Sequence, residues 1–168
     1  MGKSIRLAVA LVILLAGFAG GDARANDQFN SVAAGCVPGD PAMHFNRYFI
    51  TAGTVKHRSD KVGLITLYCN IPMAITPPKT LELVYSDDDP GAETFVNASY
   101  IKMHKSSGWI TTIATTSSNN GIQDGAVHSV ATPFSDTYDL TQYLYYVRVD
   151  MDRSRFSNIA VFYGVTVH

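Results

Sequence analysis

The chain has 168 residues, a formal net charge of −1 and 46% hydrophobic residues. No cluster of lysine and arginine offers the basic face that sequence-independent nucleic-acid binding needs, so that class of function is excluded. The length suits a targeting segment followed by one domain with a core of its own.

Residues 1–25 have the three parts of a secretory signal peptide. A basic start is followed by the apolar run Leu7–Gly20, and Ala23 and Ala25 form the small-residue pattern of a cleavage site. The apolar run is shorter than the roughly 20 residues that a membrane-spanning helix needs. We therefore predict export to the periplasm or the exterior, with residues 26–168 as a single mature domain.

The two cysteines, Cys36 and Cys69, both follow this segment. An even pair in an oxidising compartment predicts a disulfide, and a lone pair at this spacing matches no zinc pattern. Closing a loop of about 33 residues stabilises a fold by roughly 3–4 kcal/mol on the chain-entropy account. The bond would tie the N-terminal segment to the strand that contains Cys69.

Short stretches of period-two alternation begin near residue 44 and are separated by Gly, Pro, Asn, Asp and Ser. Strands are predicted within His44–Arg58, with a break at Gly53, and within Lys61–Pro72, which is apolar on both faces as central strands are. Thr80–Ser86 is the next strand, with alternate apolar residues on one face.

The most acidic stretch, "YSDDDPGAE", follows this strand. Its first interpretation is a hairpin turn, with Pro90 inside it and Gly91 at positive φ. A calcium site is the second interpretation, because calcium binds carboxylate oxygens, although the spacing is not that of an EF-hand and adjacent side chains point apart. The candidate calcium ligands are Asp87, Asp88, Asp89 and Glu93.

The C-terminal half predicts further strands. Thr94–Lys105 and Trp109–Thr116 alternate, and a polar turn follows with "NG" at residues 120–121. Residues 127–133 form another short strand, and Ser135–Gln142 is predicted to contain one helical turn capped by its first residues.

The last two strands, residues 143–152 and 159–168, are the most regular and are predicted to form an antiparallel hairpin. On the first of these strands, Arg148, Asp150 and Asp152 share one solvent-exposed face and are interpreted as a charge ladder, that is, as charged side chains that interact along the strand. The residues expected to face inward on the second are Ile159, Val161, Tyr163, Val165 and Val167.

About eight strands in one domain predict an all-β fold, an antiparallel β-sandwich of jelly-roll type. The order "GCVPGDP", "GLITLYCNIP", "LELVYSDDDPG", "YYVRVDMDRS" and "VFYGVTV" resembles a loose set of exported, single-domain, β-rich bacterial proteins of unknown function. The resemblance implies export, the disulfide and the sandwich. It implies no activity and assigns no functional residue.

Catalytic patterns are not found in the sequence. There is no nucleophile elbow or phosphate-binding glycine loop, and the mature region has only two glutamates, Glu82 and Glu93. No histidine pair has metal-ligand spacing, and all five histidines are interpreted as surface or edge residues. The aromatic residues, among them Tyr100, Trp109 and Tyr146, are interpreted first as ordinary strand and core residues, and second as exposed rings that would stack on sugars.

The leading hypothesis is a secreted, non-catalytic module for surface, adhesion or ligand binding, without a cofactor. Its partners would be a glycan, a surface protein or another copy of the chain. A calcium-dependent carbohydrate-binding module is the alternative. A small outer-membrane β-barrel is a third hypothesis, disfavoured because such strands need about 9–11 residues and a clean lipid face.

Overall fold

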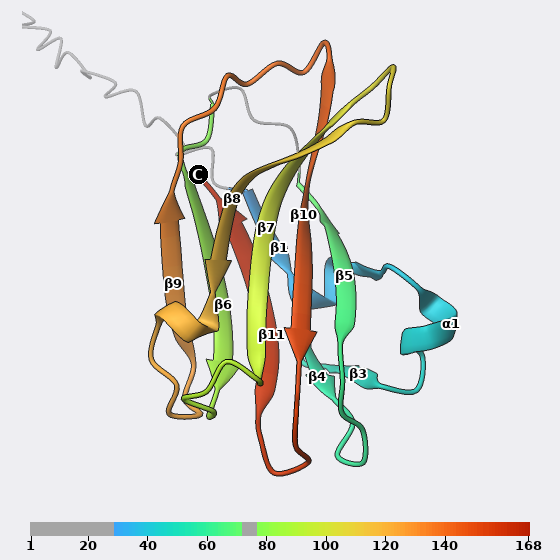
Figure 1. Ribbon diagram of the computed structural model, residues 1–168, viewed down its shortest axis with the longest axis vertical. Helices are drawn as coiled ribbons and strands as arrows, with labels where there is room; N and C mark the ends of the chain where they lie inside the picture. Colours follow the sequence, from blue (N-terminus) through green and yellow to red (C-terminus); the bar gives the residue numbers. More distant parts are fainter. Residues whose placement is uncertain (1–28, 72–76) are drawn as a thin grey trace, which may run out of the picture.

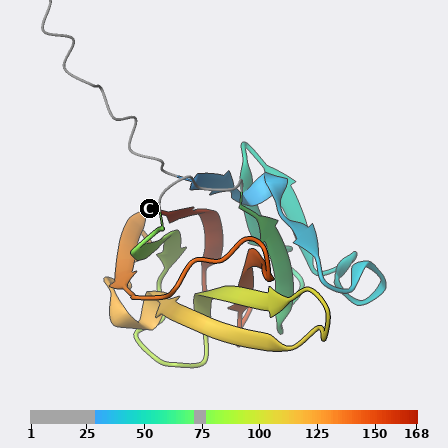
Figure 2. The same ribbon diagram turned by 90° about the horizontal axis from the view of Figure 1, so that it is seen from above.

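The computed structural model describes residues 29–71 and 77–168, which form two antiparallel sheets packed face to face (Figures 1 and 2). Sheet A has the order β3 (Tyr48–Thr51), β4 (Thr54–His57), β11 (Ala160–Val167), β6 (Thr80–Asp87) and β9 (His128–Pro133), and β1 (Phe29–Val32) also pairs with β11. Sheet B has the order β2 (Val37–Pro38), β5 (Ile65–Asn70), β10 (Tyr143–Asp152), β7 (Phe95–His104) and β8 (Ile110–Ser117).

The helices in the described part of the chain are single turns: η1 (Ala33–Gly35), α1 (Pro41–His44) and η2 (Ser118–Asn120). Within the same residues, no helix has the length and apolar character needed to cross a membrane.

The eight strands β4 to β11 form a jelly roll. They alternate between the four-strand rows β4-β11-β6-β9 and β5-β10-β7-β8, and of their seven connections only β7–β8 stays within one sheet. This confirms the predicted all-β sandwich. The three short strands β1, β2 and β3 precede the jelly roll and extend the same edge of both sheets.

The core lies between the sheets and is filled by alternate residues of the long strands, as period-two patterning requires. Leu81, Leu83 and Tyr85 of β6 and Val147 and Val149 of β10 belong to this core, and each is 0% exposed. Full burial of one such side chain stabilises the fold by roughly 1.5–3 kcal/mol.

The predicted disulfide between Cys36 and Cys69 is confirmed, with the two Cα atoms 4.2 Å apart. Cys36 lies between η1 and β2, and Cys69 lies on β5. Both residues are buried, so the bond fixes the N-terminal segment against the edge of sheet B at the border of the core.

The predicted hairpin of the last two strands is wrong. β10 lies in sheet B and β11 in sheet A, and the connection between them crosses from one sheet to the other. Alternation in two consecutive strands fits either arrangement, because it fixes which face of each strand is buried and not which strand is its neighbour.

The predicted inward face of the last strand is only half right, because β11 contains a β-bulge. The register against β6 shifts between Phe162 and Gly164, which leaves Tyr163 as the extra residue. Phe162 is therefore fully buried, whereas Ile159, expected inside, is 41% exposed just before the strand. Beyond the bulge, Val165 and the following alternate residue face inward as predicted.

The helical turn predicted in Ser135–Gln142 is present only at the end of the segment, where the backbone N–H of Tyr143 donates to the carbonyl of Asp139 (3.0 Å), and its predicted cap at Ser135 or Asp136 is wrong. The segment is extended up to Asp139, and a turn follows over residues 140–142. The cap is Asp139 itself, whose carboxylate accepts hydrogen bonds from the backbone N–H groups of Thr141 (2.8 Å) and Gln142 (3.2 Å).

Candidate functional site

The acidic stretch connects β6 of sheet A to β7 of sheet B and is therefore a crossover, not the hairpin turn expected. Gly91 does not adopt the positive φ predicted for it. The stretch is instead held by aspartates that accept hydrogen bonds from backbone N–H groups two residues ahead: Asp87 from Asp89 (3.0 Å) and Asp89 from Gly91 (3.1 Å).

Asp87 is fully buried and binds the β8–β9 connection from inside the protein. Its second carboxylate oxygen accepts hydrogen bonds from Ser118 Oγ (2.6 Å) and Gln123 Nε2 (3.2 Å). Ser118 Oγ in turn accepts one from the backbone N–H of Val96 on β7 (2.9 Å). The carboxylate thus joins both sheets and one loop, which is a structural role.

Asp88 and Asp89, by contrast with Asp87, both accept hydrogen bonds from the connection between β10 and β11. Asp88 accepts a hydrogen bond from the backbone N–H of Ile159 (2.6 Å), and Asp89 accepts one from Asn158 Nδ2 (2.8 Å). Glu93 is exposed. Among the residues that the structure describes, no three His, Cys, Asp or Glu side chains are grouped so as to hold a metal ion, and calcium binding stays a prediction.

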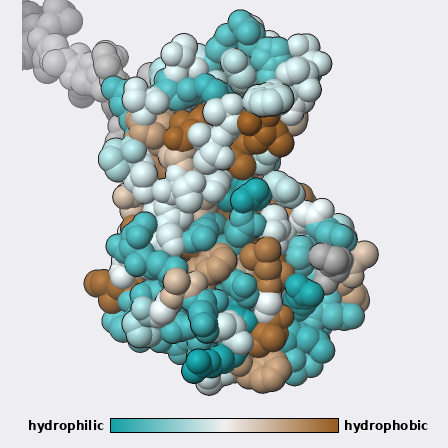
Figure 3. All heavy atoms as spheres, viewed as in Figure 1, coloured by the Kyte–Doolittle hydropathy of each residue, from teal (hydrophilic) through white to brown (hydrophobic). Residues whose placement is uncertain are grey.

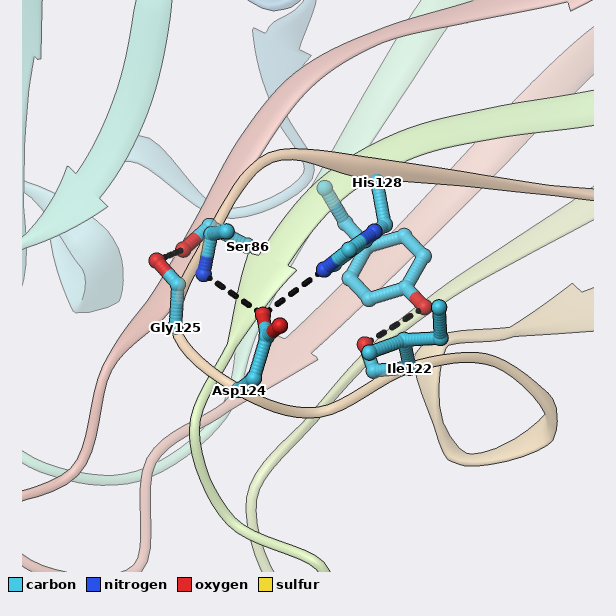
Figure 4. Close-up of polar contacts among 7 residues, drawn as sticks. Ser86, Ile122, Asp124, Gly125 and His128 are labelled. Atoms are coloured by element: carbon cyan, nitrogen blue, oxygen red, sulfur yellow. Dashed lines mark hydrogen bonds and ion pairs between the residues drawn. The ribbon is translucent and has the colours of Figure 1, made fainter.

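Figure 4 shows how the β8–β9 connection is fastened to β6. Tyr85 Oη donates to the carbonyl of Ile122 (2.9 Å), and Ser86 Oγ donates to that of Gly125 (2.7 Å). Asp124 accepts from His128 Nε2 (2.7 Å), and the N–H of Ala126 and this histidine together lower the pKa of the Asp124 carboxyl. These polar groups close one end of the sandwich.

Polar and aromatic side chains gather on the outer face of sheet B, on the neighbouring strands β5 and β10. We call this surface the platform: Thr66, Tyr68, Tyr146, Arg148 and Asp150. These residues alternate with buried core residues and pair across the two strands, so they share one face. Figure 3, viewed from the side on which sheet B lies in front, shows a mainly hydrophilic surface with scattered apolar patches.

Two tyrosine rings form the aromatic part of the platform. The rings of Tyr68 and Tyr146 are 5.7 Å apart between centroids and inclined at 65°, and Tyr68 is 38% exposed. Burial, followed by the neighbouring Tyr68, raises the pKa of Tyr146. Because the rings are steeply inclined, a flat ligand can stack on one of them while the other bounds its side.

Gly39, next to β2, fixes the position of the Tyr68 ring. A Cβ at this position would lie 2.8 Å from Cε2 of Tyr68, so the ring rests directly on the glycine backbone. The disulfide holds this segment in place three residues earlier, at Cys36.

The polar part of the platform is a short chain of hydrogen bonds. Arg148 Nε donates to Asp150 (2.8 Å), and Thr66 Oγ1 donates to the other carboxylate oxygen of Asp150 (2.7 Å). This pairing bears out the charge ladder expected on β10 for Arg148 and Asp150, and the part predicted for Asp152 stays a prediction. The Arg148 side chain is 44% exposed, so the guanidinium is both oriented by Asp150 and open to solvent.

Other residues from the sequence analysis lie elsewhere. His44 and His57 are each only 5% exposed, so the prediction that they lie on the surface was wrong. The ring of His57 donates a hydrogen bond from Nε2 to the carbonyl of Gly63 (2.8 Å). Tyr100 is buried in the core, whereas Trp109 is 75% exposed where β8 begins. The platform residue that sequence reasoning missed is Tyr68, whose strand was apolar on both faces and gave no sign of which face is outside.

No known protein-family profile matches the chain, and no curated protein matches it. Solved structures with some likeness are mutants of family 29 carbohydrate binding modules. One mutant of CBM29-2 is 8% identical, with 82% of this chain and 78% of that chain covered and a TM-score of 0.34. Another, complexed with cellulohexaose, is 10% identical over 83% and 78%, with a TM-score of 0.30. Values this low establish no relationship and no shared ligand.

Proposed function

We propose that the protein is a non-catalytic binding module that holds a glycan on the platform of sheet B. One observation carries the proposal: two accessible tyrosine rings lie beside a half-exposed arginine that a neighbouring carboxylate orients. This is the combination that a sugar needs, because its C–H faces stack on aromatic rings and its hydroxyl groups accept hydrogen bonds from fixed donors.

The shape of the site supports an extended ligand. The platform lies on the surface of a sheet and its side chains follow the long strand β10, so a glycan chain would lie across the face rather than enter a cavity. Hydrogen bonds from Arg148 would fix its register, because the guanidinium is held at Nε by Asp150 and loses little freedom on binding.

The disulfide supports the proposal that the module acts outside the cytoplasm, because such bonds persist in oxidising compartments. Binding of a surface protein and self-association stay predictions.

The test is affinity electrophoresis of residues 26–168 in gels that contain soluble neutral polysaccharides, followed by titration calorimetry with those that retard the protein. Tyr68→Ala and Tyr146→Ala should each weaken binding roughly tenfold, equivalent to about 1.4 kcal/mol, which is a usual value for one stacking contact. Phe156→Ala is the matched control, because Phe156 is 64% exposed and lies outside the platform. Equal retardation of all three variants would contradict the proposal.

Gly39→Ala provides a second test that removes no ligand contact. The added methyl group would displace the Tyr68 ring, since no Cβ fits 2.8 Å from its Cε2. We expect binding to weaken while the disulfide and the melting temperature change little. The control is Gly35→Ala, because a Cβ at Gly35 would make only ordinary contacts, 3.9 Å from Ser31 Oγ and 4.0 Å from Val32 Cγ2.

A further inference from the structure

A pocket of about 310 Å³ opens on sheet A, remote in the topology from the platform of sheet B. It lies where β3 and β4 meet the start of β11 and the connection that precedes it. Phe49, Lys56 and Val161 form one row across β3, β4 and β11, because Lys56 pairs with both of the others, and this row makes one wall.

Arg153 lies at the pocket and is only 6% exposed. Its Nη2 donates to the backbone carbonyls of Arg58 (2.7 Å), Ser59 (3.1 Å) and Lys61. Its Nε is buried and has no hydrogen-bond partner within the described residues. A buried guanidinium is usually paired with a carboxylate, because backbone carbonyl groups compensate only part of its charge.

Two acids act near Arg153 without forming an ion pair with it: Asp60, and Asp152, which acts on the neighbouring His57. Among the described residues Arg153 forms no ion pair, and the acid that acts on it, Asp60, is exposed and paired with Lys61 (3.3 Å). The lining residues of the pocket include the cations Lys56 and Arg153 and no aspartate or glutamate. The pocket is therefore positively charged.

The lining also has an apolar part, formed by Phe49, Ile159, Ala160 and Val161, beside the polar residues Ser59 and Asn158. Phe49 and Ile159 are each 41% exposed at the pocket, and Val161 and Ala160 lie beneath them. His57 also lines it, and burial lowers the pKa of its ring, so the ring stays neutral while it donates to Gly63. A ligand that fits this pocket would have a negatively charged group that pairs with Lys56 and Arg153 and an apolar body that packs against Phe49 and Ile159.

We propose that this pocket binds an organic carboxylate, with the carboxylate group near Lys56 and Arg153 and the body against Phe49 and Ile159. A carboxylate matches the planar guanidinium and would form the ion pair with Arg153 that none of the described residues provides. The site is separate from the glycan platform and does not depend on the proposed function. The carboxylate could belong to an acidic sugar or to a small aromatic acid, and the body of the ligand distinguishes the two.

The experiment is an ¹H–¹⁵N NMR titration of the oxidised protein, residues 26–168, with sodium benzoate, sodium glucuronate and sodium chloride at constant ionic strength. Saturable shifts at the backbone N–H groups of residues 56–61 and 153–159 are expected with one of the two carboxylates and not with chloride. Benzoate as the better ligand would indicate an aromatic acid, and glucuronate an acidic sugar.

Lys56→Gln should weaken the affinity at least fivefold, since it removes one of the two cations. Lys79→Gln is the control, because Lys79 is an exposed lysine outside the pocket, and its affinity should equal that of the unchanged protein. Ile159→Ser tests the apolar wall without touching a charge and should weaken benzoate binding by a similar factor. The proposal would be overturned if the chemical shifts changed linearly with the concentration of all three salts, or if Lys56→Gln and Lys79→Gln bound the carboxylate with equal affinity.

Discussion

Asp87 provides the sharpest test of how the two sheets are joined. In Asp87→Asn one carboxylate oxygen becomes an NH₂ group, and every partner of the carboxylate is a donor: the N–H of Asp89, Ser118 Oγ and Gln123 Nε2. In either orientation of the amide, its NH₂ group therefore faces at least one donor in a site from which water is excluded.

The expected cost follows from these contacts. A buried hydrogen bond to a charged acceptor stabilises a fold by roughly 1.5–3 kcal/mol, and an unsatisfied buried donor costs roughly 1–3 kcal/mol. We expect Asp87→Asn to lower the free energy of unfolding by about 2–4 kcal/mol. In a domain of this size that lowers Tm by roughly 6–15 °C.

The assay is urea unfolding at pH 7 followed by circular dichroism, with a thermal melt beside it. Glu93→Gln is the control, since it removes a carboxylate from the same acidic stretch at an exposed position, and its unfolding midpoint should be unchanged. A midpoint for Asp87→Asn within error of the control would refute the assignment of Asp87 as the junction between the sheets.

Three further predictions concern the disulfide, pH and calcium. Replacing both Cys36 and Cys69 by Ser should lower the free energy of unfolding by about 3–4 kcal/mol, read from urea midpoints, and a loss under 1 kcal/mol would contradict the chain-entropy account. Because burial lowers the pKa of His57 from 6.5, the unfolded chain binds a proton at this residue more readily than the folded chain does. The contribution of His57 to the free energy of unfolding should therefore be full above pH 6.5 and fall below it. Urea midpoints measured from pH 5 to 8 should show this fall, and His57→Gln should make it shallower. Melts with calcium and with chelator should coincide, since Asp87, Asp88 and Asp89 already accept hydrogen bonds from the protein, Asp87 from one connection and the other two from another. A rise of several degrees with calcium that Asp88→Asn abolishes would instead establish a calcium site.

Local patterning was sufficient for the class of fold and for the disulfide. The series Leu81, Leu83, Tyr85 gave the buried face of β6 correctly, and the strands of the jelly roll lie close to the stretches that alternate in the sequence. The same series extended by two residues reaches Asp87, so the sequence did contain a signal that this aspartate faces the core. A carboxylate is rarely buried without partners, and those partners are more than 30 residues away.

The alternation of apolar and polar residues could not predict which strands pair with each other or in which register. Whether β10 pairs with β11 or crosses to the other sheet depends on contacts with β5, β6 and β7, which lie far away in the sequence. The bulge at Tyr163 reverses the inward face within one strand and has no signature in alternation, because Val161 is buried as well as Phe162.

The platform was only partly accessible from sequence. Tyr146, Arg148 and Asp150 could be placed together because they share one face of a single strand. Tyr68 and Thr66 join them through pairing across strands separated by about 80 residues, and Gly39 supports the ring from a third segment. The pocket beside Arg153 likewise forms only when β3, β4 and the β10–β11 connection meet.

The position of β11 has a consequence for the order in which the chain can fold. This strand pairs with β1, β4 and β6 at once, so three strands made earlier have no common neighbour until residues 160–167 have been synthesised. Up to that point sheet A is divided into pieces, and only the pair β6–β9 can pack on the inner face of sheet B. A nascent chain of this topology would remain open and extensible through most of its synthesis, because its stabilising contacts are nearly all non-local.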